Sequence, residues 1–300
     1  MKRTIILLLL PFALMQGAFA KTPEDPESPW TTSGFFSQQL NQVSFSHWAA
    51  GGESSLSSTS LLTLGANYKQ DRIHWENKLE LAFGIMKTED APTRKNQDLI
   101  DLVSKLGREV APRLSTTALL NFKSQFAQGF NYPNDSVAVS RFMAPGYLIL
   151  SAGLDYKPWE FLSVFVSPAT GKITFVRDQS LADQGAFGVR PGENSRSEFG
   201  AMLRLAFEKE VFENVGLSSK LELFNNLTDE NRSNRKNTDV NWQTTINMKV
   251  NRFITASILL HMIYDHDIPI PVGETPQGDT VYGPRLQVQQ MLGVGLSYSF

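Results

Sequence analysis

Segments in which every second residue is apolar recur along this chain, and the last of them shows the pattern best. One face of this segment is apolar except at Gln290, and the other carries Gln, Gly and Ser residues with one Met. The apolar positions are Leu286, Val288, Leu292, Val294, Leu296, Tyr298 and Phe300. A period of two is that of a β-strand whose faces meet different surroundings. The segment is longer than a typical soluble strand and therefore predicts a membrane-crossing strand.

The same alternation predicts further strands upstream. Clear segments span residues 73–85, 114–126, 148–156, 199–207, 215–223, 240–250 and 254–264. Weaker candidates span residues 33–46, 54–69, 98–107 and 160–167. Together with the last segment they make about twelve strands, an even number, as bacterial single-chain barrels have.

The links between these strands alternate in length. Short links at 70–71, 109–111, 157–159, 210–213 and 251 alternate with long ones at 47–53, 87–97, 129–145, 168–196, 228–239 and 265–285. Short periplasmic turns and long outer loops are typical of outer-membrane barrels. The sequence thus predicts an all-β fold, a single antiparallel transmembrane barrel with both termini periplasmic. In the longest link, residues 173–176 could extend a hairpin and residues 181–187 could form a short helix.

The N-terminus predicts export. Lys2 and Arg3 precede an apolar run, and Ala18-Phe19-Ala20 is an A-x-A cleavage site, the layout of a secretory signal peptide. We expect residues 1–20 to be removed after Ala20, residues 21–32 to form a flexible periplasmic lead, and residues 33–300 to form the barrel in the bacterial outer membrane. The chain has no Cys, so neither disulfides nor a lipid anchor at a cysteine is expected.

Charge patterning describes the expected interior of the barrel. The net charge of −2 and the hydrophobic fraction of 41% do not indicate a nucleic-acid partner. The residues predicted to face the lumen are Arg72, Glu76, Lys78, Glu80, Lys123, Arg204, Lys220, Glu222 and Lys249, with Glu198 and Glu208 on the same faces. Their signs nearly balance, whereas a strongly ion-selective pore would carry an excess of one sign. A narrow or occluded lumen is therefore expected.

Few residues indicate chemistry. Asp265-His266-Asp267, with His47, could bind a cation or polarise water, but a polar loop at the membrane surface is the favoured interpretation. We therefore predict no catalytic, cofactor-binding or metal-binding residue and no cofactor, although a rim protease pairing Asp with His stays open. The sequences around Ser136 and Thr280 resemble the Asp-Ser/Thr-apolar acceptor of Bacteroidota protein O-glycosylation.

Several short motifs carry a family resemblance. They are His47-Trp48-Ala49-Ala50-Gly51-Gly52-Glu53-Ser54-Ser55, Trp75 with Asn77, residues 104–107, Ser167-Pro168 with Gly171-Lys172, Asp239 with Trp242, and Tyr264-Asp265. In this order the chain resembles a Bacteroidota outer-membrane family known only as a domain of unknown function, number 3078. The resemblance implies a barrel in that outer membrane and no assigned activity. Leu296, Tyr298 and Phe300 at the end also resemble the signal read by the barrel-assembly machinery, which we expect as a partner besides outer-membrane lipid.

Three functions are compatible with these predictions. The first is a narrow channel or transport barrel for a small or amphipathic solute. The alternatives are a closed-lumen structural or surface-interaction barrel, and an enzyme at the rim that acts on lipid, glycan or peptide. Large energised importers have about 22 strands and a plug, for which this chain is too short.

Overall fold

The computed structural model describes residues 28–43, 54–88, 91–268, 270–275 and 280–300. The predicted signal peptide with Ala18 and Ala20, and most of the predicted lead, lie outside these residues, as does His47. The first strand begins at Trp30, slightly before the predicted start of the barrel at Ser33.

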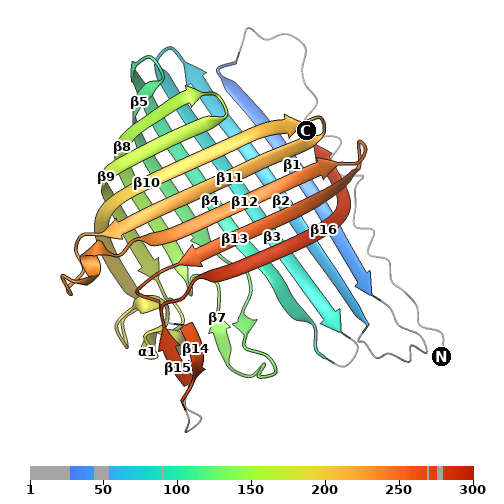
Figure 1. Cartoon of the computed structure of the whole chain (residues 1–300), viewed down its shortest axis with the longest axis vertical. Helices are drawn as coiled ribbons and strands as arrows, with labels where there is room; N and C mark the ends of the chain where they lie inside the picture. Colours follow the sequence, from blue (N-terminus) through green and yellow to red (C-terminus); the bar gives the residue numbers. More distant parts are fainter. Residues whose placement is uncertain (1–27, 44–53, 89–90, 269, 276–279) are drawn as a thin grey trace.

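Twelve antiparallel strands of the described chain close into one barrel (Figure 1), which confirms the predicted fold. Sequential barrel strands pair with one another, and β16 returns to pair with β1. The barrel strands are β1 (Trp30–Val43), β2 (Ser55–Gln70), β3 (Ile73–Thr88), β4 (Arg94–Ala111), β5 (Leu114–Ser124), β8 (Gly146–Trp159), β9 (Leu162–Phe175), β10 (Ser195–Phe212), β11 (Val215–Asn226), β12 (Asp239–Lys249), β13 (Ile254–Tyr264) and β16 (Gln287–Ser299). Closure pairs the backbone groups that an open sheet would leave at its edges.

The links follow the predicted alternation. Short turns at residues 71–72, 112–113, 160–161, 213–214 and 250–253 join strands at the end near the C-terminus. The opposite end in Figure 1 carries the small elements β6 (Gly129–Phe130), β7 (Ala138–Ser140), α1 (Gln179–Asp183), η1 (Ala186–Gly188), β14 (Ile270–Glu274) and β15 (Thr280–Gly283). A further 3-10 turn, η2, spans Asn234–Lys236. Among the described residues, no helix is long and apolar enough to cross a membrane.

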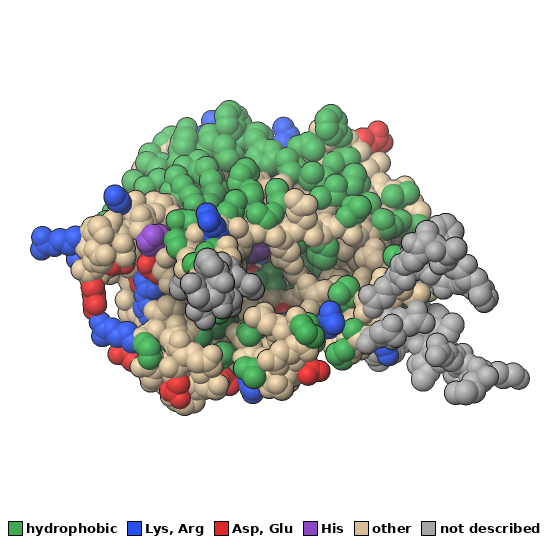
Figure 2. All heavy atoms as spheres, turned by 60° about the horizontal axis from the view of Figure 1, so that its bottom comes forward, with side chains coloured by type: hydrophobic (Ala, Val, Ile, Leu, Met, Phe, Trp, Pro, Cys, Tyr) green, Lys and Arg blue, Asp and Glu red, His purple; other side chains and the backbone are tan. Residues whose placement is uncertain are grey.

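The outer wall of the barrel is apolar. Hydrophobic side chains cover much of it in Figure 2, above an outer rim that is hollowed and edged with charged side chains. Near the turns, the rings of Trp30 and Tyr68 lie 5.3 Å apart, and those of Trp30 and Trp75 lie 5.7 Å apart. Aromatic side chains of this kind gather at the membrane interfaces of barrels. A closed strand ladder with an apolar exterior satisfies the two requirements of a membrane-spanning sheet.

The link predicted at Pro168–Arg196 is wrong in its bounds. Strand β9 continues through Pro168 to Phe175, and β10 begins at Ser195. Pairing skips Pro168 on both sides, so it lies at a bulge, where its missing N–H costs no ladder bond. The hydroxyl of Ser167 donates to the carbonyl oxygens of Ala152 (2.8 Å) and Ala169 (2.9 Å). In the sequence, the proline predicts the end of a strand. In the structure, the strand continues through it because the bulge accommodates it.

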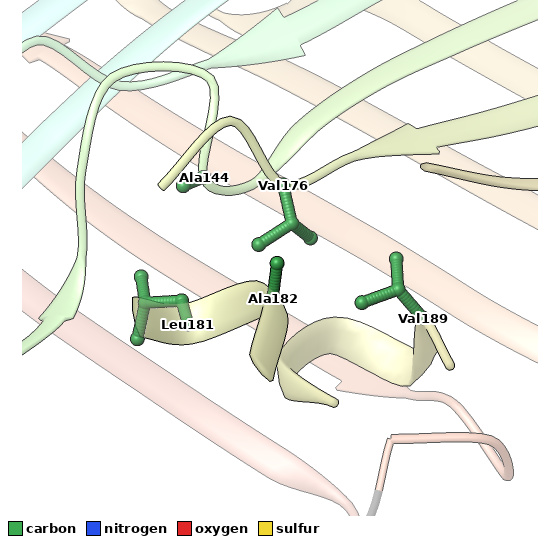
Figure 3. Packing of buried hydrophobic residues seen from close by; sticks show 5 residues of the cluster. All are labelled: Ala144, Val176, Leu181, Ala182 and Val189. Carbon is green, nitrogen blue, oxygen red and sulfur yellow. The ribbon is translucent and has the colours of Figure 1, made fainter. Parts of the chain in front are cut away.

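The remaining link, residues 176–194, packs on the preceding outer link. Its Val176, Leu181, Ala182 and Val189 form a small core with Ala144 (Figure 3). Asp178 caps α1 by accepting from the Leu181 N–H (3.1 Å), and the Arg141 guanidinium lies 3.0 Å from the same carboxylate. The two links therefore form an ordered outer cap.

Leu203 provides a test of the lipid-facing wall. It pairs with Leu223 and Val166 on the apolar face of β10, whereas Ala206 on the same strand lines the lumen. We expect Leu203→Arg to lower the free energy of unfolding by about 2–4 kcal/mol, because an arginine near the bilayer midplane loses its hydration. Urea unfolding in lipid vesicles measures this. Ala206→Arg is the matched control, and equal losses from the two variants would contradict the assignment of faces.

Candidate functional site

An outer cluster of charged side chains lies inside the barrel near its outer rim. It comprises Lys172, Arg196, Glu198, Asp239, Asp265 and Asp267. The Lys172 Nζ lies 2.8 Å from Asp239, 3.2 Å from Asp265 and 3.7 Å from Glu198. Arg196 pairs with Glu198 (3.0 Å) and with Asp267. The cluster contains four carboxylates and two cations, so it carries an excess of negative charge.

A central cluster crosses the lumen below the outer cluster. It comprises Asp101, Lys123, Arg204, Lys220 and Glu222. The Lys123 Nζ lies 2.8 Å from Glu222, the Arg204 Nε lies 3.6 Å from Glu222, and the Lys220 Nζ lies 3.0 Å from Asp101. Neutral side chains complete it: Asn121 donates to Asp101 (2.5 Å), Asn241 donates to Glu222 (3.2 Å), and His261 lies 2.8 Å from Asn241. These partners come from strands far apart in sequence, so the cluster ties opposite walls together.

An inner cluster lies toward the turns. It comprises Glu76, Lys105, Asp155 and Lys157. The Lys105 Nζ lies 2.7 Å from Asp155 and 3.8 Å from Glu76, and Lys157 also pairs with Glu76. Ser163 joins them, accepting from Lys105 (2.9 Å) and donating to Asp155 (2.6 Å). Two cations and two carboxylates make this cluster neutral.

Two cavities lined by the described residues lie inside the lumen. The outer cavity, about 270 Å³, combines the apolar side chains of Leu99, Ile149, Met202, Phe224 and Ile263 with charged groups of the outer and central clusters. The inner cavity, about 800 Å³, is lined by charged and polar side chains, among them Lys78, Glu80, Arg204 and Lys220. Asp101 and Gln243 line both cavities. The central cluster therefore stands where the two cavities meet.

The residues predicted to face the lumen lie in several parts of the barrel. Lys123, Arg204, Lys220 and Glu222 meet in the central cluster, and Glu76 lies in the inner cluster. Lys78, Glu80 and Glu208 line the inner cavity, and Gln243 reaches Glu80 at 3.5 Å. Glu198 belongs to the outer cluster. Two residues lie at the end of the barrel near the turns: Arg72 is exposed in the β2–β3 turn, and Lys249, on the same face of β12 as Gln243, is exposed as the last residue of that strand.

Sequence reasoning missed several charges that organise the lumen. Asp101 and Lys105 lie on β4. On this strand the inward-facing Leu99 and Val103 are apolar and the outward-facing Ser104 is polar, so the alternation of polar and apolar positions is weak. Lys172 was missed because, in the sequence, Pro168 predicts the end of its strand. The spacing of Asp101, Val103 and Lys105 at every second position was the available signal for β4, and the continued alternation after Pro168 was the signal for Lys172.

The rim residues that could carry chemistry are engaged in ion pairs. Asp265 is buried and bound to Lys172, and Asp267 is bound to Arg196, while His266 lies in the turn between them. Within the described chain, no group of three or more His, Cys, Asp or Glu residues could hold a metal ion. Ser136 is exposed and its hydroxyl donates to Asn134 (2.8 Å), while Thr280 begins β15.

Comparisons with known proteins agree on the kind of fold. The family model described as a protein of unknown function (DUF3078) matches residues 40–130, in line with the resemblance to a domain of unknown function. No curated protein matches the sequence. The chain forms an antiparallel β-barrel with the apolar outer wall of a membrane-spanning sheet.

Similar solved structures include the COG4313 outer membrane channel from Pseudomonas putida F1, with 13% identity, TM-score 0.41, and coverage of 94% of this chain and 99% of that one. The translocator domain of autotransporter NalP from Neisseria meningitidis has 12% identity and TM-score 0.36, with coverage of 92% and 90%. A Pseudomonas aeruginosa FadL homologue has 7% identity and TM-score 0.30, with coverage of 90% and 89%.

Proposed function

We propose that this barrel is a narrow transport protein that accepts a small amphipathic solute with a cationic head into its outer cavity. The observation that carries the proposal is the outer cavity itself, which joins an apolar wall to charged side chains within one cavity. Ligand sites are typically concave and mostly apolar, with a few polar groups that orient the ligand. An apolar tail against Phe224, Met202 and Ile149 and a polar head toward Asp239 and Asp265 would match this lining.

The charge distribution supports a cationic head. Four carboxylates face two cations in the outer cluster, whereas the central cluster holds three cations, Lys123, Arg204 and Lys220, against two carboxylates. Clefts lined by an excess of one sign concentrate ions of the opposite sign. A cation is thus attracted at the rim and repelled at the centre, which holds it in the outer cavity.

A closed-lumen structural barrel is the second candidate. The ion pairs that join opposite walls favour it, because side-chain pairs across a lumen rigidify and fill a barrel. The two roles differ in one respect: a transport barrel binds solutes in its cavities, and a structural barrel has no such requirement.

Titration of the purified protein with fluorescent probes tests the proposal. We expect a dansyl-labelled alkylammonium ion to bind more tightly than the matched dansyl-labelled alkylcarboxylate, because of the acidic excess at the rim. Ile149→Trp should abolish binding by filling the outer cavity. The double variant Asp239→Asn with Asp265→Asn should remove the preference for the ammonium probe. Binding that is absent in the natural protein, or unaffected by Ile149→Trp, would favour the structural role.

We also infer export through the inner membrane of a Bacteroidota cell. The support is the N-terminal pattern ending in Ala18-Phe19-Ala20 and the motifs that resemble the Bacteroidota family. The expected mature protein begins at Lys21. Its intact mass after extraction from outer membranes measures this, and a mass that includes residues 1–20 would contradict cleavage.

A further inference from the structure

The seam between β1 and β16 is the shortest in the barrel. Their pairing runs from Gly34 opposite Phe300 only to Gln39 opposite Gly295. Strand β1 continues to Val43, still paired with β2, and β16 begins at Gln287, still paired with β13. Figure 1 shows the two strands adjacent near the C-terminus and diverging toward the outer rim. Among the described residues, a wedge therefore opens between residues 40–43 and residues 291–294.

An opening of this kind has an energetic cost. Unpaired backbone N–H and C=O groups are unfavourable in hydrocarbon and occur at membrane depth only where they line a polar passage or are covered. The other seams of the barrel are paired over ten or more positions. A wedge confined to one seam is therefore a local feature of this seam and not a property of the whole barrel.

The side chains around the wedge suit an amphipathic molecule. On the outward face, Leu40 and Leu292, on opposite edges, are 61% and 66% exposed, and Val288 is also exposed. The polar residues Gln42 and Gln290 lie on the same faces. On the lumen side, Gly293 has no side chain, and the Gln39 Oε1 occupies the space beside it, 2.0 Å from where a Cβ would lie. The lipid-facing side of the wedge thus combines leucine and valine with glutamine side chains, and the amide side chain of Gln39 fills its narrow end.

A neutral hydrogen bond links the seam strand β16 to a strand that lines the outer cavity. The Gln289 amide nitrogen donates to the Gln97 Oε1 at 2.8 Å, joining β16 to β4 across the lumen. Gln97 lies two residues from Leu99, and Gln289 pairs with His261; both Leu99 and His261 line the outer cavity. The bridge thus joins β16, which forms the seam with β1, to β4, which contributes Leu99 to the cavity wall. Breaking it requires no separation of charges, unlike opening the central cluster.

We propose that the amphipathic solute passes between the outer cavity and the outer leaflet sideways, through the Gln97–Gln289 bridge and the wedge between β1 and β16. This inference rests on the proposed function of the outer cavity. The central cluster blocks the straight path along the lumen, and the lateral path leads an apolar tail directly to lipid.

A crosslink across the wedge tests this route. The natural chain has no cysteine, so Leu40→Cys with Val294→Cys, the next positions after the last paired ones, can be joined selectively by a bifunctional thiol reagent. The matched control is Ser37→Cys with Ser297→Cys, a pair that lies opposite within the closed part of the seam. Crosslinked protein is loaded with the dansyl-labelled alkylammonium probe in vesicles that carry a rhodamine lipid. Energy transfer to rhodamine then reports release of the probe into lipid.

The wedge crosslink should leave equilibrium binding unchanged and slow release by about tenfold or more, as closing a gate does. The control crosslink should leave both unchanged. A second variant pair, Gln97→Ala with Gln289→Ala, needs no crosslink and should speed release. Release unaffected by both the wedge crosslink and the alanine pair would overturn the lateral route and leave the binding proposal standing. Absent binding in the natural protein would instead overturn the proposed function.

Discussion

Glu222→Ala should lower the free energy of unfolding by about 3–5 kcal/mol, the loss typical of breaking a buried ion pair from one side. Glu222 is 7% exposed and accepts from Lys123 at 2.8 Å and from Asn241 at 3.2 Å, with the Arg204 Nε at 3.6 Å. Its removal leaves two cations without their shared carboxylate. The Arg204 Nη1 is already buried without a hydrogen-bond partner among the described residues, so little remains to stabilise that side chain.

A matched triple variant separates charge from side-chain loss. Lys123→Ser, Arg204→Ser and Glu222→Ser remove both signs together and keep Lys220 paired with Asp101. We expect the triple variant to be more stable than Glu222→Ala, although it carries more substitutions, because no charge is left unpaired. Urea unfolding in vesicles measures both. A triple variant at least as unstable as the single one would show that the central cluster does not act through its ion pairing.

Gly34→Val should strongly reduce the folded fraction of the barrel. The Gly34 N–H donates to the Phe300 carbonyl oxygen (2.7 Å), and the Phe300 N–H donates to the Gly34 carbonyl oxygen (2.9 Å). A Cβ at Gly34 would lie 2.2 Å from two ring carbons of Phe300. An aromatic ring laid over a strand glycine is a known device for closing barrel sheets. Valine would displace the ring at the pair that starts the short β1–β16 seam.

Heat-modifiable mobility on a gel reports folding of this kind. Gly216→Val is the matched control, because none of the described residues lies within 4 Å of a Cβ built at that strand glycine, and it should fold normally. Deleting Phe300 or replacing it with Lys should impair folding as Gly34→Val does. If the C-terminal residues also address the assembly machinery, the Phe300 variants should lose more in cells than in refolding with pure lipid. Normal folding of Gly34→Val would contradict the closing role of this contact.

The fold was predictable because a membrane-spanning barrel imposes a regular local pattern on its sequence. Each strand has lipid on one side and the lumen on the other, which imposes the alternation seen in residues 254–264 and in the final strand. The turns near the C-terminus are short, so they interrupt this pattern little. Prediction failed where a local rule had a structural exception. In the sequence, Pro168 predicts the end of a strand, and only the pairing with the neighbouring strands shows that the ladder skips it at a bulge.

The candidate site was less predictable for a physical reason. Alternation indicates which face a side chain occupies, as for Lys123, Arg204 and Glu222, but the partner across the lumen depends on strand tilt and register. Lys123 meets Glu222 from a strand 99 residues away, and Gln289 meets Gln97 from 192 residues away. Positive and negative charges nearly balance over the whole lumen, and this balance conceals how they are distributed along it. The acidic excess of the outer cluster is offset by cations in other parts of the lumen.

Conductance in a planar bilayer tests the central claim, that the charged central cluster separates two cavities of one transport lumen. The natural protein should conduct weakly in KCl, because Lys123, Arg204 and Glu222 block the junction of the cavities. The folded triple serine variant should conduct about tenfold more, since it removes three long side chains at that junction. Equal conductance of the two proteins would contradict the account, as would a natural protein that already conducts like a wide porin.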